Sequence, residues 1–201
     1  MILVIDYGMG NLRSVSKALE HLGAQVKVSS EPSDIQSADK IVLPGVGAFG
    51  DAMAELKRFG LINPIKDAIQ KKIPFLGICL GLQLLFPKSE ESPKKTGLGI
   101  FTGEVKLFRS PNVKIPHMGW NSVKVVQKHP LLEGIEDKTF FYFVHSYYAV
   151  PKDNKLAALT CEYGEETFAA ALGNDSVFAT QFHPEKSQAA GLKILKNFIS
   201  W

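Results

Sequence analysis

Short apolar runs alternate with amphipathic stretches along the first half of the chain. The apolar runs predict strands over 2–6, 25–29, 40–43 and 74–78. Apolar residues at helical spacing between them predict helices over 11–22, 51–58 and 61–71. Asn11 is a candidate N-cap for the first helix, and Gly23 is its predicted stop. This alternation predicts an α/β fold, with an open, mostly parallel sheet flanked by helices on both faces.

The second half of the chain has no long helical pattern until its end. Polar residues with two prolines predict an exposed loop over 87–97. Short extended runs separated by turns follow it, over 100–108, 121–127, 139–145, 155–161, 167–172 and 176–182. Such runs favour antiparallel strands added to the parallel core. An amphipathic helix is predicted over about 187–200, with an inward face made of Leu192, Leu195, Phe198 and Ile199.

Composition narrows the class of protein. With 201 residues the chain is long enough for a substantial core, and we expect a single domain over 1–201. Its 45% hydrophobic and 21% charged residues are ordinary for a soluble globular protein. A net charge of +3 with scattered lysines does not predict a nucleic-acid partner. The start lacks the features of a signal peptide, and no apolar run is long enough for a bilayer, so no membrane partner is expected. Two cysteines favour a reduced, cytoplasmic setting over a disulfide scaffold.

The run from Phe75 to Phe86 carries the strongest chemical signal. It begins as a strand and changes to helical spacing at Cys79, which has a glycine two residues away on each side. This is the form of a nucleophile elbow, a sharp strand-to-helix turn that lifts a side chain above the sheet edge, although the known elbow carries serine. The glycines keep side chains away from the turn and the substrate. A helix that begins after Cys79 favours its thiolate form.

A cysteine nucleophile needs a base and a group that orients the base. Of five histidines, only His183 ends a strongly apolar strand and has an acid, Glu185, two residues later. In an extended segment these side chains point the same way, so the carboxylate can hold one ring nitrogen while the other serves Cys79. The predicted triad is Cys79, His183 and Glu185. Cys161 lacks flanking glycines and is interpreted as a packed structural cysteine.

The oxyanion of such a reaction needs backbone donors at the same sheet edge. We expect one donor from the amide of Leu80 and the second from Val46 or Gly47, in the loop after the third strand. Residues 45–50 also match the dinucleotide fingerprint Gly-x-Gly-x-x-Gly. Pro44 interrupts that turn and a lysine pair stands where an acidic ribose ligand belongs, so a nucleotide site is disfavoured. The histidines are not at ligand spacing with cysteines or carboxylates, so no metal is predicted.

Two motifs, taken together, resemble a known family. Gly77-Ile78-Cys79-Leu80-Gly81-Leu82-Gln83 and His183-Pro184-Glu185 are similar to the motifs of the class I, or triad, glutamine amidotransferases. Within that class, four further stretches resemble the glutaminase subunits of imidazole glycerol phosphate synthases: 6–11, 44–53, 116–121 and 142–147. The resemblance covers essentially the whole chain and implies a flavodoxin-like α/β sheet with added antiparallel strands. The catalytic positions do not depart from the family pattern.

The resemblance implies a reaction and its residues. Cys79 attacks the side-chain amide of L-glutamine, His183 moves the proton, and Glu185 orients His183. Water then releases glutamate from a cysteinyl thioester. The residues implied to hold the amino-acid head of glutamine are Gln83, Glu91, His145, Ser146 and Tyr147. No cofactor is implied.

The resemblance also implies a partner. Ammonia passes to a cyclase subunit, a (β/α)₈ barrel, in a heterodimer that converts PRFAR to imidazole glycerol phosphate and AICAR in histidine biosynthesis. The chain itself has no nucleotide or phosphosugar motif, which is consistent with such a partner. The composition of 116–121 suits an interface, and Lys186 stands beside the triad. The candidate partner contacts are His117, Met118, Trp120, Asn121 and Lys186.

Three alternatives stay open. One is the glutaminase of another synthase, such as anthranilate or aminodeoxychorismate synthase, although 44–53 and 116–121 argue against it. A second is a non-enzymatic relative, which the intact Cys79, His183 and Glu185 oppose. The third is a stand-alone cysteine hydrolase, which predicts full glutaminase activity without any partner.

Overall fold

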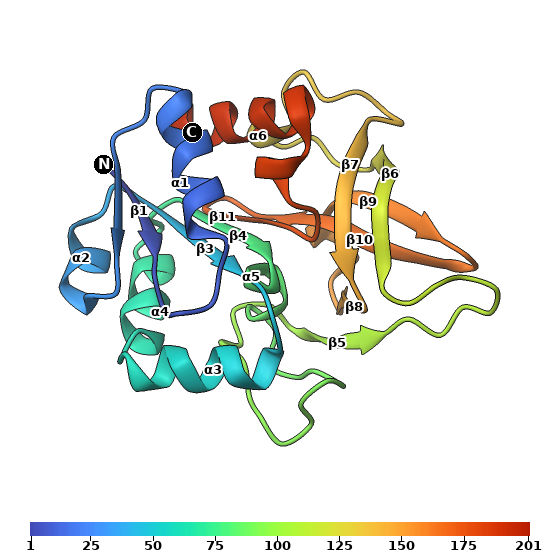
Figure 1. The fold of residues 1–201 in the computed structure, drawn as a ribbon, viewed down its shortest axis with the longest axis horizontal. Coiled ribbons are helices and arrows are strands. Elements are labelled where there is room, and N and C mark those ends of the chain that lie inside the picture. The colour runs from blue at the N-terminus through green and yellow to red at the C-terminus, as the bar shows by residue number, and fades with distance from the viewer.

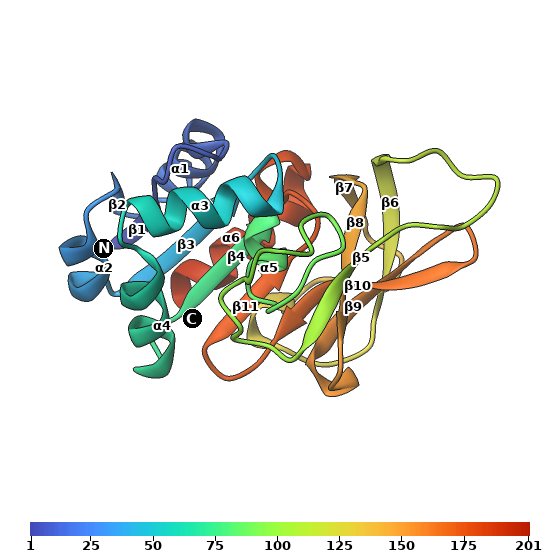
Figure 2. The same cartoon turned by 90° about the horizontal axis from the view of Figure 1, so that it is seen from below.

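One long sheet runs through the computed structural model, which describes all residues from 1 to 201 (Figure 1). The sheet has nine strands in the order β2-β1-β3-β4-β11-β10-β9-β6-β7. A separate two-stranded sheet pairs β5 with β8. Helices gather around one end of the long sheet, and the other end is built almost entirely of strands (Figure 2).

Five parallel strands form the core of the helical half. They are β1 (Ile2–Ile5), β2 (Val26–Ser29), β3 (Lys40–Gly45), β4 (Phe75–Cys79) and β11 (Val177–Thr180). Every residue of β1, β4 and β11 is buried, as expected for strands covered on both faces. In β1, Leu3 and Ile5 join one hydrophobic cluster while Val4 joins the other, because alternate side chains of a strand face opposite sides.

Helices cover both faces of this core (Figure 1). One face carries α1 (Leu12–His21) and α6 (Gln188–Ser200), and the other carries α3 (Phe49–Arg58) and α4 (Ile62–Gln70). The three helices predicted in the first half are therefore confirmed. The short α2 (Pro32–Ser37) is not predicted by the apolar pattern, because Ile35 is its only buried residue. None of the helices combines the length and apolar character needed to cross a membrane.

Antiparallel strands extend the sheet beyond β11. They are β10 (Glu166–Gly173), β9 (Ala157–Tyr163), β6 (His117–Val125) and β7 (Phe140–His145). The small antiparallel sheet consists of β5 (Gly103–Leu107) and β8 (Tyr147–Pro151). Three short 3₁₀ turns complete the structure: η1 (Pro130–Leu132), η2 (Asn154–Leu156) and η3 (Pro184–Lys186). The predicted addition of antiparallel strands to a parallel core is confirmed.

The strand pairing corrects three details. Residues 176–182, predicted as part of the antiparallel addition, contain β11, which is parallel to β4 and so belongs to the core. β3 does not end before Pro44 but continues to Gly45. Pairing of β3 with β1 stops at Val42, so the missing N–H of Pro44 breaks no ladder bond on that side. β6 begins at His117 rather than at 121, and β8 is an additional strand.

Two further predictions need revision. The loop over 87–97 is only partly exposed: Ser89 is buried and forms a bridge to Val105. α6 buries Gly191, Ile194, Leu195 and Phe198, whereas the predicted Leu192 and Ile199 are only partly buried. The face is rotated because α6 packs closely on η3, where a Cβ at Gly191 would lie 1.9 Å from the Pro184 carbonyl oxygen.

Candidate active site

Cys79 stands at a strained turn where β4 ends and α5 (Leu80–Gln83) begins. Its φ of 55° lies in a region that residues other than glycine rarely adopt. The flanking glycines are required by close backbone packing. A Cβ at Gly81 would lie 2.0 Å from the Leu43 carbonyl oxygen, and one at Gly77 would lie 2.9 Å from the Gly81 oxygen. The chain thus forms the sharp strand-to-helix turn that the sequence predicts.

The helix after Cys79 is shorter than its pattern suggests. α5 has four residues, and every residue from Leu80 to Phe86 is buried. The segment therefore has no solvent-facing side, and the predicted helix after Cys79 is present but only one turn long. A single helical turn has only a small dipole.

His183 and Glu185 form a buried pair. The distance from His183 Nδ1 to Glu185 Oε1 is 2.8 Å, and the two side chains are 2% and 0% exposed. The prediction that an extended segment aligns them is wrong, because η3 is a 3₁₀ turn that brings the carboxylate back to the ring. Ser187 Oγ donates a hydrogen bond to the His183 carbonyl oxygen and accepts one from the Tyr142 amide, which fixes this turn against β7.

The surroundings of His183 favour its protonated form. Burial disfavours the imidazolium, but the hydrogen bond to Glu185 and the negative charges of Cys79 and Glu185 together outweigh burial. They hold the pKa of His183 well above its usual value. No hydrogen bond joins His183 Nε2 to any protein atom. Cys79 Sγ instead contacts the Val144 carbonyl oxygen at 4.0 Å and Gln181 Nε2 at 3.8 Å. Cys79 and His183 line the same pocket, and the Nε2 atom of His183 is free for a reacting group.

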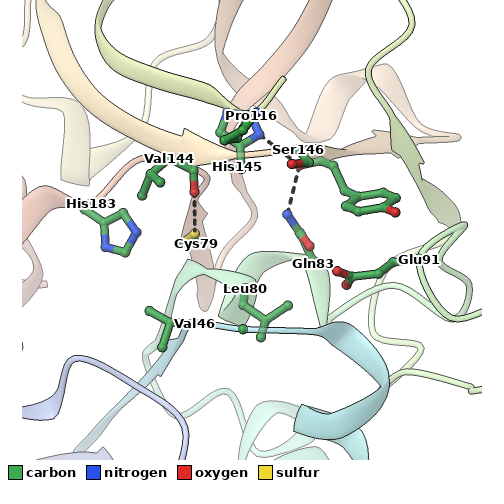
Figure 3. A pocket seen from close by; sticks show the side chains of 12 residues that line it. Val46, Cys79, Leu80, Gln83, Glu91, Pro116, Val144, His145, Ser146 and His183 are labelled. Atoms are coloured by element: carbon green, nitrogen blue, oxygen red, sulfur yellow. Dashed lines mark hydrogen bonds between the residues drawn. The ribbon is translucent and has the colours of Figure 1, made fainter. Parts of the chain in front are cut away.

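A pocket of about 330 Å³ lies over Cys79 (Figure 3). Most of the residues predicted from the sequence line it: Val46, Gly47, Cys79, Leu80, Gln83, Glu91, His145, Ser146, Tyr147 and His183. Pro116 and Val144 complete the lining, and Glu185 is not part of it. The lining thus comes mainly from the loop after β3, from β4, α5 and the loop after α5, from β7 and β8, and from the segment after β11. These elements meet at the carboxyl end of the parallel strands, where ligands bind in open α/β sheets.

Glu91 ties the loop after α5 to the start of α3. Its Oε2 accepts a hydrogen bond from the Phe49 amide at 2.7 Å, and Ser92 Oγ accepts one from the Gly50 amide. These remote side chains satisfy amides of the first turn of α3, because the N-cap residue Ala48 has no side-chain oxygen. One carboxylate oxygen of Glu91 remains available at the pocket.

The loop predicted to supply an oxyanion donor lies beside the elbow. Gly45 pairs with Cys79 in the register of β3 and β4, so the backbone of 45–47 runs past the sulfur. Gly47 has a φ of 92°, and Val46 is 41% exposed. The Leu80 amide begins α5 on the other side of Cys79. Both predicted donor segments are therefore at the pocket.

The stretch predicted as an interface divides into two faces. Met118 and Trp120 are 62% and 45% exposed, whereas His117 is 3% exposed and points into the protein. The prediction that His117 offers its side chain to a partner is therefore revised. Asn121 donates a hydrogen bond to the Glu162 carbonyl oxygen. Lys186 is exposed, with its Nζ 5.9 Å from the ring centre of Tyr142.

Two residues near Cys79 are not predicted from the sequence. Gln181 is fully buried, and its side-chain amide donates towards the Cys79 sulfur. The only feature of the sequence that could have indicated this role is a polar residue within an apolar run. The Tyr7 hydroxyl is buried without a hydrogen-bond partner, close to Gly45. Burial and the charge of Cys79 raise the pKa of Tyr7 above its usual value. The only feature of the sequence that could have indicated Tyr7 is an aromatic residue within a glycine-rich turn.

Cys161 and the carboxylates offer no second reactive centre. Cys79 and Cys161 are both free thiols. Burial raises the pKa of Cys161 to about 12, as expected for an inert packed cysteine. Histidine, cysteine, aspartate and glutamate side chains do not gather anywhere in groups of three that could hold a metal ion.

Comparisons with known proteins agree with these features. The family model described as "Glutamine amidotransferase class-I" matches residues 3–201. The "Imidazole glycerol phosphate synthase subunit HisH" of Rhodopirellula baltica is 51% identical over 201 residues, covering 100% of this chain and 97% of that protein. The protein of the same name from Moorella thermoacetica is 51% identical over 197 residues, covering 98% of this chain and 93% of that protein.

Solved structures share the fold at low sequence identity. A structure described as "Crystal structure of glutamine amidotransferase" has a TM-score of 0.77 at 15% identity and covers 100% of both chains. The "Structure of PurLQS from Thermotoga maritima" has a TM-score of 0.77 at 22% identity, covering 99% of this chain and 96% of that chain. The predicted fold class, a parallel α/β core with an antiparallel extension, is confirmed.

Proposed function

We propose a mechanism and a partner for this chain. The chain belongs to the class-I glutamine amidotransferase family, and it is a glutaminase subunit of imidazole glycerol phosphate synthase in histidine biosynthesis. The observation that best supports the mechanism is the convergence of Cys79 and His183 on one pocket, with Glu185 behind the ring. We treat residues 1–201 as one domain, since a single sheet joins both halves of the chain.

The reaction proceeds in two stages. Cys79 Sγ attacks the side-chain amide carbon of glutamine, so that a C–S bond forms and the carbonyl oxygen becomes an oxyanion. His183 Nε2 gives the proton taken from the thiol to the amide nitrogen, the C–N bond breaks, and ammonia leaves a thioester behind. His183 then takes a proton from water, whose oxygen attacks the thioester. Glutamate leaves as that proton returns to the sulfur. Glu185 holds the ring through Nδ1 in both stages.

Backbone amides stabilise the oxyanion. The donors are the amide of Leu80 and an amide of the 45–47 loop, from Val46 or Gly47. Support comes from the register of Gly45 with Cys79 and from the glycine conformation at 47, which lets this loop reorient without side-chain strain.

Charged and polar groups at the far end of the pocket hold the amino-acid head of glutamine. The free oxygen of Glu91 suits the ammonium group, and backbone groups of Ser146 and Tyr147 suit the carboxylate. Gln83 uses its amide nitrogen within the protein, which leaves its oxygen for the ligand. His145 acts from behind this wall, since its ring bonds to protein atoms.

An exposed apolar surface suits a protein partner. The docking face, defined as Met118, Trp120 and Phe140, lies on β6 and the edge strand β7. Large exposed apolar side chains beside a charged residue such as Lys186 are typical of interfaces. The partner is the cyclase subunit, a (β/α)₈ barrel that forms a heterodimer and receives ammonia directly. The complex works in the cytoplasm, where the thiol of Cys79 stays reduced.

Glutamate release tests this function. We expect weak glutaminase activity from the chain alone and strongly raised activity with the cyclase and its bound ligand, because a docked partner can reorient the oxyanion loop. Equal turnover with and without the cyclase would contradict the proposal that the cyclase is the partner.

Cys79→Ala is expected to abolish glutamine hydrolysis while the complex still makes product from added ammonia. Surviving glutamine hydrolysis in this variant would exclude Cys79 as nucleophile. Co-purification with a chorismate-binding protein would instead favour another synthase.

A further inference from the structure

Two buried histidines, His117 on β6 and His145 at the end of β7, face each other beside the pocket. Their exposed fractions are 3% and 6%, and His117 Nδ1 lies 3.1 Å from His145 Nε2. Aromatic rings surround the pair: Phe143 stacks on His117, and Phe108 and Phe168 contact both imidazoles. Such surroundings exclude water, so the nitrogens depend on each other and on nearby protein groups.

The direction of each hydrogen bond in this pair is fixed. Burial lowers the pKa of both rings, so each is neutral and carries one N–H. His145 Nδ1 lies 2.8 Å from the Tyr147 carbonyl oxygen, which only accepts, so Nδ1 is the donor. His145 Nε2 must then accept from His117 Nδ1. His117 Nε2 in turn accepts from the Asn121 amide at 3.3 Å.

The same chain of hydrogen bonds continues to the sulfur. The Tyr147 carbonyl oxygen also accepts from Gln83 Nε2 at 2.9 Å. Gln83 Nε2 donates to Gln181 Oε1 at 3.2 Å, and Gln181 Nε2 donates to Cys79 Sγ at 3.8 Å. The Tyr147 oxygen is therefore the point where the histidine pair meets the groups around Cys79. In Figure 3 the dashed hydrogen bonds drawn from Gln83 and from His145 meet at one oxygen atom.

The outer end of the chain of bonds lies under the docking face. Along β6, His117 comes just before Met118, and Asn121 comes just after Trp120. Because side chains alternate sides along a strand, His117 and Asn121 lie on the side opposite to Met118 and Trp120. A partner that binds Met118 and Trp120 therefore contacts the same strand that carries His117 on its buried side. Because β6 pairs with β7 in register His117 with His145, this strand is joined to the residues before Tyr147.

We infer that His117 and His145 are positioning residues that hold the Tyr147 carbonyl and couple the docking face to the glutamine pocket. The inference rests on the proposed function, because it assigns the pair a role in glutamine hydrolysis. A structural role alone would affect stability. A positioning role also affects the KM for glutamine and the factor by which the cyclase raises turnover.

The test measures glutamate release by the full chain with the cyclase. At position 145, an asparagine side chain places its amide near the position of the His145 Nδ1 atom, whereas a glutamine side chain places its amide nearer the position of the His145 Nε2 atom. We expect His145→Gln to raise the KM for glutamine about tenfold, because the donor to Tyr147 is lost. His145→Asn is expected to keep KM within about threefold of wild type. His117→Phe removes the link to His145 and is expected to lower the stimulation by the cyclase about fivefold with an unchanged dissociation constant.

Phe168→Leu is the matched control, since Phe168 contacts both imidazoles without a hydrogen bond to either ring. It is expected to lower the melting temperature but to leave KM and the stimulation factor unchanged. The positioning role is rejected if His145→Gln leaves the KM for glutamine unchanged, or if Phe168→Leu raises this KM equally at the same loss of stability. Wild-type chain that releases no glutamate with the cyclase would instead contradict the proposed function, so the two failures are distinct.

Discussion

Nδ1 of His183 lies 2.8 Å from Oε1 of Glu185, and neither side chain has significant contact with solvent. A buried carboxylate this close to a ring holds it in one tautomer and stabilises its protonated form. Because the partners are two residues apart on the tight turn η3, the ring orientation is set by local backbone geometry. In the proposed mechanism the pair prepares Nε2 of His183 to give a proton to departing ammonia.

Glu185→Gln is expected to lower kcat for glutamine hydrolysis by roughly two to four orders of magnitude. The neutral amide no longer stabilises the imidazolium, so the pKa of His183 falls and the alkaline limb of the pH–rate profile moves to lower pH. Glutamate release at saturating glutamine, measured with the cyclase over a pH series, checks both effects. Glu165→Gln, at an exposed carboxylate, is the matched control. A kcat within about threefold of wild type would show that Glu185 does not orient the base.

Gly81→Ala is expected to destabilise the elbow. Its Cβ would lie 2.0 Å from the Leu43 carbonyl oxygen, so β3 and α5 must separate. We expect the free energy of unfolding to fall by about 3 kcal/mol, with loss of glutaminase activity. Gly60→Ala is the control, because Gly60 has a φ of 69° and open space around it, so alanine brings strain without a clash. Gly60→Ala should lower the free energy of unfolding, measured with urea, by about 1 kcal/mol. Equal losses in the two variants would refute the role of close packing at Gly81.

The centre of the parallel core follows from the hydrophobic pattern because β1, β4 and β11 are buried on both faces. Apolar runs such as 2–5 and 75–78 have no other stable location. The direction in which strands pair, by contrast, does not follow from the hydrophobic pattern. The apolar run before His183 predicts a strand, yet nothing local says that β11 lies parallel to β4, since this depends on where the chain returns to the sheet. α2 is likewise hidden, because a single buried isoleucine has no periodicity.

The proposed catalytic residues are visible in the sequence because their chemistry demands rare combinations. A cysteine between two glycines and a histidine followed by a nearby acid each restrict the backbone as well as the side chain. Gln181 carries no such signature, since its role exists only through the sulfur and Gln83 that it contacts. The burial of His117 was equally hidden, because the side of β6 that it takes is set by pairing with β7.

The stability of the fold is expected to fall between pH 6.5 and pH 5. Burial lowers the pKa of His117 to about 4 and that of His145 to about 3, while unfolded histidine titrates near 6.5. In this window the unfolded chain binds protons that the folded chain does not, so acidification favours unfolding. Each residue contributes up to about 1.4 kcal/mol per pH unit. His183 adds little here, because its raised pKa leaves it protonated when folded and increasingly so when unfolded.

Urea unfolding at pH 6.5 and pH 5 checks this dependence. The double variant His117→Asn with His145→Asn should lose less stability on acidification than wild type, because both titrating groups are gone. Phe168→Leu should be less stable than wild type at both pH values by a similar amount, since it removes no titratable group. An unchanged pH dependence in the double variant would show that the pair is not the source of the effect.

The docking face gives the most direct test of the partner. Trp120 and Met118 project from β6, and the Trp120 indole lies 6.1 Å from the Tyr142 ring on the edge strand β7. A large exposed aromatic at such a site is a typical binding hot spot. Trp120→Ala is therefore expected to weaken binding of the cyclase by about 2 kcal/mol, or roughly thirtyfold in the dissociation constant, while the melting temperature stays close to wild type.

Val28→Ala is the matched control for this experiment. Val28 is 42% exposed, similar to the 45% of Trp120, but it lies on β2 at the opposite end of the sheet. Titration calorimetry with the purified cyclase should give an unchanged dissociation constant for Val28→Ala. Equal weakening by both variants would indicate a general loss of structure. Unchanged binding by Trp120→Ala would move the interface away from β6 and β7, and with it the surface from which the histidine pair is coupled to Cys79.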